Sequence, residues 1–373
     1  MLVLKFAENT RYCKLRVRCD NRRSMLLSRV LSRQGYYADF GKQHSMKKFY
    51  AAGALLIAAT VCQAQDSSGC QVFTKGQVEV KNFGRTSRVY GEMAPFNHCH
   101  KSVSLELPSR GANKLGEKPP VVVLLHGGGG LEGYQKSAAG IWRSEGFATL
   151  VFDAFEMNGL DSSTDLVKYK LASDSKQKLI FSSALGAYQW LAQKSEIDAT
   201  RIFFQGHSQG GHVAVNIAGV ADLKNVRAVV AEGSPPYGVG FPNHIQIPLM
   251  LLYGENDRYG VEAEVMYKVK GRCDYSEFFA GVPEGYGKTC NRSASMPGSV
   301  SPSPLEWADK IKALNEPLTL VIAAGGGHAS LFSDYQETKR DVGGRTFYAT
   351  RGAPVGTREK TWATLKEFFK SKL

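Results

Sequence analysis

One short segment of the chain has the pattern of a catalytic serine. Residues 206–210 read Gly-His-Ser-Gln-Gly, after the apolar run RIFF and before the helix-like stretch GHVAVNIAGV. In a GxSxG pattern between a strand and a helix, a sharp turn strains the backbone of the serine, so small residues must flank it. Such a serine projects above the carboxyl ends of the strands. We therefore predict that Ser208 is a nucleophile.

A second segment is rich in glycine. His126 and four glycines follow the apolar run PVVVLL. Glycines after a buried strand let the backbone approach a ligand, and their amides can stabilise a developing oxyanion. A flexible turn is one alternative, and a phosphate-binding loop is another, although the GK[ST] ending of such a loop is missing. We assign the amides of Gly127 or Gly128, together with that of Gln209, to an oxyanion hole.

A serine nucleophile requires a base, and the base requires an acid to orient it. If the chain order is serine, acid, histidine, the candidates for the base are His212, His244 and His328. His212 lies four residues into the predicted helix, and His244 precedes the strand that should carry the acid. His328, in VIAAGGGHAS after a predicted strand, is the expected base.

The acid should also stand at the carboxyl end of a strand. Asp257 lies in GENDRYG, three residues beyond the strand-like PLMLLYG. Glu255 and Glu232 are competitors, and Glu255 is nearer to the strand end. The turn-like sequence ENDR favours the aspartate at its third place. We predict Asp257 as the acid.

Short apolar runs alternate with longer amphipathic stretches from about residue 100 onward, which predicts βα repetition and a mainly parallel sheet. The predicted strands are 102–107, 120–125, 148–152, 201–204, 228–231, 248–253 and 318–323. The first alternates as a half-buried strand does, and the other six read as strands buried on both faces. The predicted helices are 134–144, 175–194, 209–220, 304–314 and 358–369.

The N-terminal part of the chain differs from the rest. Of 47 Lys and Arg and 34 Asp and Glu, residues 1–64 hold 12 and 3, so the formal charge of +13 is concentrated there and does not indicate a nucleic-acid partner. Residues 46–64 have the positive start, short apolar run and small-residue cleavage site of a signal peptide. The 13 apolar residues of this run are too few for a membrane span. We expect cleavage after Ala64, and we interpret residues 1–45 as a start assigned too far upstream.

The signal peptide predicts a periplasmic or secreted protein, and cysteine usage agrees with export. After residue 64 the chain holds an even set of four cysteines, for which we predict disulfides from Cys70 to Cys99 and from Cys273 to Cys290. Their spacing is not that of a metal site. Residues 65–373 are expected to form one catalytic domain, with an irregular insertion at about 259–304 that the second disulfide ties down near the site.

Other residues are weaker candidates. His98 and His100 flank Cys99 as metal ligands could, but a third ligand is not evident, so we expect a loop with a disulfide. Asp153 and Glu156, in FDAFEMNG after a strand, either cap a loop or shape the pocket. Tyr237, in GSPPYGVGFP, either lines the substrate pocket or packs in the core.

Taken together, the HGGGG, FDAF, GHSQGG, LLYGENDR and GGGHA segments resemble an α/β-hydrolase of the dienelactone hydrolase family over roughly residues 100–373. The resemblance implies an α/β fold, with a mostly parallel central sheet and helices on both faces. It also implies hydrolysis of a small-molecule ester or lactone through a covalent intermediate, without a metal or organic cofactor. The chain departs from the founding members of that family, which have a cysteine where this sequence has Ser208.

Two alternatives remain at this stage. A peptidase of the prolyl oligopeptidase type shares the triad and the fold, although the sequence holds no β-propeller before the catalytic part. A catalytically inactive α/β-hydrolase fold could serve as a binding protein, because a fold does not determine a function. The sequence does not specify the acyl group, the alcohol or the oligomeric state.

Overall fold

The structure is a computed structural model. It describes residues 70–74, 78–80, 88–90, 95–109, 111, 115–161, 173–236, 238, 240–258, 265–268, 302–342 and 345–373. These residues all belong to one unit of the chain, Gln63–Leu373. No helix within these ranges has both the length and the apolar character that crossing a bilayer requires.

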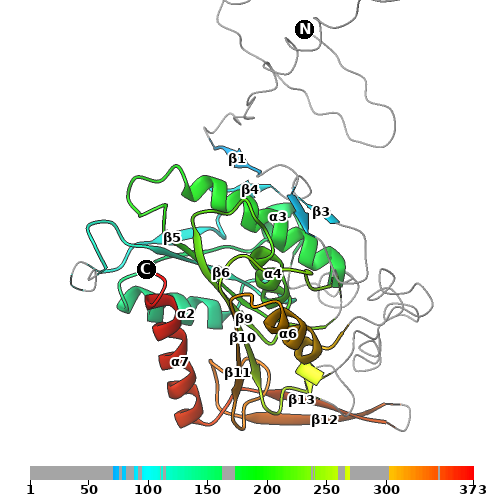
Figure 1. Ribbon diagram of the computed structural model, residues 1–373. Helices are drawn as coiled ribbons and strands as arrows, with labels where there is room; N and C mark the ends of the chain where they lie inside the picture. Colours follow the sequence, from blue (N-terminus) through cyan, green and yellow to red (C-terminus); the bar gives the residue numbers. More distant parts are fainter. Residues whose placement is uncertain are drawn as a thin grey trace, which may run out of the picture. The chain divides into compact units, whose positions relative to one another are not determined.

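A seven-stranded sheet forms the centre of this unit (Figure 1), with the strand order β11-β10-β9-β8-β6-β7-β5. Its strands are β5 Ser104–Glu106, β6 Val121–Leu125, β7 Ala148–Val151, β8 Ile202–His207, β9 Val226–Glu232, β10 Leu249–Gly254 and β11 Leu318–Ala323. Strand β5 pairs antiparallel with β7, and all the other pairs are parallel. Each strand overlaps one that the sequence predicts, so the mainly parallel sheet is confirmed.

Five α-helices are described, and each overlaps a predicted helix. They are α2 Gly133–Ser144, α3 Ser173–Leu191, α4 Gln209–Ala218, α6 Pro304–Ala313 and α7 Val355–Lys370. Buried residues of α3, α4 and α6 form one hydrophobic cluster with the sheet, and those of α2 and α7 form a second one. Helices therefore cover both faces of the sheet, as parallel strands with helical crossovers require.

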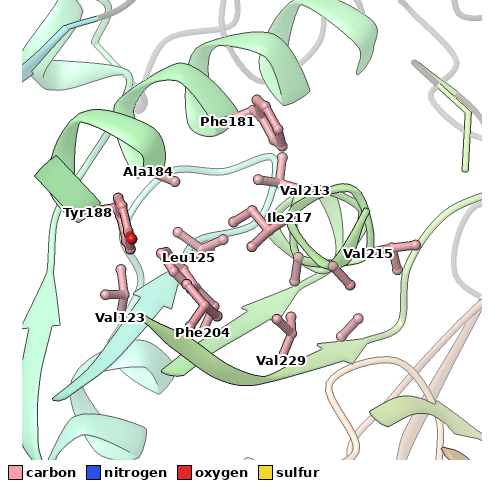
Figure 2. Close-up of a cluster of buried hydrophobic side chains, with 14 of the residues drawn as sticks. Val123, Leu125, Phe181, Ala184, Tyr188, Phe204, Val213, Val215, Ile217 and Val229 are labelled. Atoms are coloured by element: carbon pink, nitrogen blue, oxygen red, sulfur yellow. The ribbon is translucent and has the colours of Figure 1, made fainter. Parts of the chain in front are cut away.

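Side chains of each central strand alternate between these two clusters. On β6, Val123 and Leu125 belong to the cluster under α3 and α4, whereas Val122 and Leu124 belong to the opposite one. Figure 2 shows the first cluster, in which labelled side chains of α3 and α4 pack over β6, β8 and β9. The continuous apolar runs of the sequence therefore reflect strands that are buried on two sides.

Strand β11 differs from its expected burial. The sequence predicts it to be buried on both faces, but only Ala323 of its six residues is buried, and Ile322 is 37% exposed. The reason is its place at the edge of the seven-stranded sheet, beside β10 alone. An apolar run by itself does not distinguish an edge strand from a central one.

Three small two-stranded pairs were not predicted from the sequence. They are β1 Val72–Phe73 with β4 Phe96–Asn97, β2 Val78–Val80 with β3 Arg88–Tyr90, and β12 Gln336–Val342 with β13 Arg345–Arg351. The last pair matters for the site, because its C-terminal end lies beside the loop that follows β11. The strongly charged sequence QETKRDV of β12 gave no clear signal of a strand.

The disulfide between Cys70 and Cys99 is present, as predicted. It joins the residues just before β1 and just after β4. Neighbouring His98 stacks on Trp190 of α3, with ring centroids 5.6 Å apart, and the Nδ1 atom of His100 lies 2.8 Å from the Ser102 hydroxyl. These contacts are structural ones. Within the described ranges no group of three side chains could hold a metal ion.

Candidate active site

Ser208 stands at the turn between β8 and α4. Its backbone has φ 54° and ψ −117°, a conformation that residues other than glycine rarely adopt. The serine side chain is half-buried, and both neighbouring residues in the chain are buried. A Cβ atom at Gly206 would collide with the Gly210 carbonyl, and one at Gly210 would lie 2.6 Å from the Leu125 carbonyl oxygen. The strained turn and the need for glycine on both sides of the serine, which the sequence predicts, are therefore present.

The glycine-rich loop after β6 runs directly beside this turn. A Cβ atom placed on Gly127 would lie 3.4 Å from the Cβ of Ser208, and one on Gly128 would lie 3.4 Å from Cγ of Gln209. A Cβ atom at either position would thus make an ordinary van der Waals contact with the serine turn, which shows that the two segments are neighbours. The backbone segments that carry the three amides expected to form an oxyanion hole therefore lie close together.

Buried His126 fixes the start of the glycine-rich loop. Its Nε2 accepts a hydrogen bond of 2.9 Å from the Ala154 amide, so Nδ1 carries the proton and donates to the Gly127 carbonyl oxygen at 2.8 Å. Complete burial lowers the pKa of His126, which keeps the imidazole neutral in this role. His126 is therefore a structural residue.

Asp153 fixes the end of the same loop. One carboxylate oxygen accepts the Leu131 amide at 2.9 Å, and the other accepts the amides of Phe155 and Glu156 at 2.9 and 3.1 Å. Of the two roles considered for Asp153, the structure shows loop capping. Glu156 begins a 3-10 turn, Glu156–Asn158, and its carboxylate lies 4.0 Å from the ammonium group of Lys101.

Asp257 and His328 form a buried pair. The carboxylate Oδ2 of Asp257 lies 3.0 Å from Nδ1 of His328, and the two residues are only 1% and 4% exposed. Asp257 is in the turn after β10, where its amide donates to the Gly254 carbonyl at 3.1 Å. The His328 ring centroid lies 4.6 Å from that of His207, the residue before Ser208. The predicted acid and base are thus adjacent to each other and close to the serine turn.

Gly233 makes room for this pair. It follows β9 with φ 57°, and a Cβ atom there would lie 2.9 Å from Nδ1 of His328 and 3.3 Å from Oδ2 of Asp257. The position therefore requires glycine for two reasons, its backbone conformation and the space taken by the pair.

Thr350, near the end of β13, holds both partners of the pair. Its carbonyl accepts the His328 amide at 2.9 Å. Its hydroxyl donates to the Asn256 carbonyl and accepts the Arg258 amide at 2.9 Å, so it binds the backbone on both sides of Asp257. Sequence reasoning missed this residue, because its two hydroxyl contacts span more than 90 positions of the chain.

The competing candidates have other contacts. Both ring nitrogens of buried His212 face carbonyl oxygens, of Pro235 and Gly240, at 2.8 and 3.0 Å. Exposed His244 lies 2.7 Å from the Glu316 carboxylate, so its carboxylate partner is not Asp257. The Glu255 carboxylate accepts the Gly325 amide at 2.8 Å.

Three neighbours of the site were not predicted from the sequence. Tyr134 of α2 stacks edge-on against His207, with ring centroids 4.7 Å apart, and burial raises the pKa of its hydroxyl well above the usual value. Lys176 of α3 is buried, and its Nζ would lie 3.5 Å from a Cβ on Gly128. Desolvation lowers the pKa of Lys176 to about 8. Gln177 donates to the Gln209 side chain at 2.7 Å.

Several predicted features lie outside the described residues. They are Tyr237, the pair Cys273 and Cys290, and the insertion at 259–304 apart from Val265–Lys268 and its last three residues. Of the described part of the insertion, Met266–Lys268 forms a 3-10 turn. The Met266 amide of this turn donates to the Asp257 carbonyl at 2.5 Å, so the described part of the insertion contacts the backbone of Asp257.

Comparisons with known proteins agree with this architecture. Residues 122–232, from β6 to β9, match a family described as alpha/beta hydrolase fold. No curated protein sequence matches the chain significantly. Similar solved structures include a dienelactone hydrolase from Anabaena variabilis, which is 17% identical with a TM-score of 0.42, the match covering 82% of this chain and 99% of that one.

Two further structures have similar scores. A putative dienelactone hydrolase from Klebsiella pneumoniae is 15% identical with a TM-score of 0.44, over 72% of this chain and 98% of that one. The acylaminoacyl peptidase from Pyrococcus horikoshii is 16% identical with a TM-score of 0.44, over 85% of this chain and 43% of that one. The family match and the order of the parallel strands identify the fold of this chain as that of the α/β-hydrolases.

Proposed function

We propose that this protein is an exported serine hydrolase that cleaves carboxylic ester or lactone bonds through Ser208, His328 and Asp257. The observation that carries the proposal is the buried pair of His328 and Asp257, 3.0 Å apart, beside a serine held in a strained turn. A half-buried serine in a strained turn, close to an imidazole that a carboxylate orients, is an arrangement suited to acyl transfer.

The proposed reaction begins with attack by Ser208 on the carbonyl carbon of the substrate. Because Nδ1 of His328 faces Asp257, Nε2 takes the serine proton and later donates it to the leaving alcohol. Asp257 stabilises the imidazolium. The amides of Gly127 or Gly128 and of Gln209 stabilise the oxyanion, and removing one such donor costs about 3 kcal/mol of barrier in other acyl-transfer enzymes. Water, activated by His328, then releases the acid.

We further propose that residues 46–64 are removed as a signal peptide and that residues 65–373 form a single catalytic domain. The disulfide between Cys70 and Cys99 supports export, since such bonds persist in oxidising compartments. N-terminal sequencing of the exported protein tests this proposal. A mature chain that begins at Gln65 is expected, and one that begins before Met46 would contradict it.

The catalytic assignment is tested by labelling the full chain with a fluorophosphonate, a probe that reacts with a serine activated by a base. We expect labelling at Ser208, none in Ser208→Ala, and a labelling rate at least about a thousandfold lower in His328→Ala. His244→Ala is the matched control, because that imidazole is exposed and bound to Glu316. A folded wild-type protein that is not labelled would contradict the proposal and favour a binding protein.

A substrate panel then separates the remaining alternatives. Activated esters, simple lactones and peptide anilides are compared with the wild-type chain and with Ser208→Ala. Serine-dependent turnover of esters or lactones is the expected result. Turnover of the anilides alone would favour the peptidase instead.

A further inference from the structure

A second pair of ionisable side chains lies buried beside the proposed triad. Glu232 ends β9 and is 1% exposed, and His207 ends β8 and is 7% exposed. Oε2 of Glu232 lies 3.5 Å from Nδ1 of His207, longer than an ordinary hydrogen bond, and neither atom has a hydrogen-bond partner among the described residues. The reaction proposed above uses neither residue. A buried carboxylate without full hydrogen bonding is costly, so its position calls for an explanation.

Glu232 contacts both parts of the site that must meet during the reaction. Its backbone carbonyl accepts the Ser208 amide at 2.8 Å. Its Oε1 accepts the Ser330 hydroxyl and the Leu331 amide, both at 3.2 Å, in the loop that carries His328. Glu232 therefore joins the serine turn to the loop of the base.

The charge of Glu232 also lies near the imidazolium that would form during the reaction. His207 stands between them, with Nδ1 toward Glu232 and its ring 4.6 Å from that of His328. Burial lowers the pKa of His207, Glu232 opposes this shift, and the charge of His328 adds to it, so the net lowering favours a neutral His207 ring. The negative charge of buried Glu232 can then stabilise a cation that packs against the neutral ring, because the effective dielectric constant of a buried site is low.

Few other charges face this group within the described ranges. Tyr134 of α2 packs on His207 and stays protonated because burial raises its pKa, and Glu132 lies at the N-cap of the same helix. Asp257 faces His328 from the turn after β10, with buried Tyr253 of β10 behind it. The carboxylates of Asp257, Glu232 and Glu132 are thus negative groups near this pair, and Arg258, which follows Asp257 in the chain, is a basic residue on the same turn.

We propose that Glu232 is a positioning residue for the catalytic base. Its carboxylate holds the loop of His328 through Ser330 and Leu331, and its negative charge, acting across His207, stabilises the His328 imidazolium in addition to Asp257. This inference rests on the proposed function, because it assigns a second carboxylate to the same base.

The test measures the rate of fluorophosphonate labelling of Ser208 as a function of pH, in the full chain. The midpoint of the acid limb reports the ionisation of His328, so no knowledge of the natural substrate is needed. Glu232→Gln removes the charge, but its amide oxygen can still accept the bonds from Ser330 and Leu331. We expect its midpoint to lie about one pH unit below that of the wild type.

Two further variants separate charge from tethering. Ser330→Ala removes one bond to Glu232 and keeps the charge, so its midpoint should stay within about 0.3 units of the wild type. A midpoint in Glu232→Gln equal to that of the wild type would overturn the inference. If Glu232→Gln does not fold, Glu232→Asp is measured instead, because it keeps the charge. An unchanged midpoint with a reduced labelling rate would support the inference. A midpoint about one pH unit below that of the wild type would overturn it. Absence of labelling in the wild type would instead contradict the proposed function itself.

Discussion

Burial of the charged Lys176 side chain lowers the free energy of unfolding, so replacing this residue should stabilise the protein. It lies in α3 with only 6% of its surface exposed, close to the backbone of Gly128. Desolvation lowers the pKa of its ammonium group from 10.5 to about 8. Methionine has a similar length and no charge to desolvate, so Lys176→Met removes this cost while filling the same space.

The size and the sign of the effect follow from the pKa. The difference between 10.5 and about 8 corresponds to about 3 kcal/mol of disfavoured charge. The lysine is protonated in both states below about pH 8, so the whole cost is present there. Between about pH 8 and 10.5 the unfolded chain holds more protons than the folded one, so the stability of the wild type rises with pH and the cost disappears.

Chemical denaturation at pH 7 and at pH 10.5 measures this difference. We expect Lys176→Met to raise the free energy of unfolding by about 3 kcal/mol at pH 7 and by little at pH 10.5. Lys136→Met, at an exposed position of α2, is the control and should change the stability little at either pH. A Lys176→Met protein no more stable than the wild type at pH 7, or equally stabilised at both pH values, would refute the reasoning.

Two further predictions concern contacts that hold the site and the fold. Thr350→Val removes both hydroxyl hydrogen bonds beside Asp257 and should lower the labelling rate of Ser208 about tenfold or more. Thr338→Val, on the same hairpin, is the control and should leave the rate unchanged. Equal rates in the two variants would argue against a role of Thr350 in holding Asp257. Replacing both Cys70 and Cys99 by serine opens a loop of 29 residues and should lower the free energy of unfolding by about 3 to 4 kcal/mol, measured by denaturant titration; an unchanged midpoint would contradict this.

The sequence predicted where the candidate residues lie in the fold wherever local rules determine the structure. The sharp turn at Ser208 leaves no room for a Cβ atom at positions 206 and 210. This requirement for glycine can be recognised in five consecutive residues of the sequence. The strand ends that carry Asp257 and His328 were visible because each follows a continuous apolar run. Local patterns of this kind also gave the seven strands of the central sheet and the five helices.

Other parts of the site depend on contacts between distant segments, which no local pattern encodes. Thr350 contacts Asn256 across 94 positions, and Glu232 contacts Leu331 across 99. The burial of Lys176 depends on how α3 packs over the glycine-rich loop. The edge position of β11 also follows from the strand order alone, which the sequence did not specify.

The strand order explains why His328, the proposed base, is held by several contacts from distant segments. Ser208 follows β8 and His328 follows β11, with β9 and β10 between them. Neighbouring strands lie about 4.8 Å apart, so these two ends are separated by about 14 Å, farther than an imidazole can reach. The loop that carries His328 must therefore extend from β11 across the ends of β10 and β9 toward Ser208.

Three features make this path possible. Gly233, at the end of β9, has no side chain in the space where His328 meets Asp257. Thr350 of β13 binds the loop from one side, and Glu232 binds it from the other. The hairpin β12–β13 follows His328 in the chain, so the part of the sequence that least resembles an α/β repeat supplies a contact that holds His328 beside Asp257.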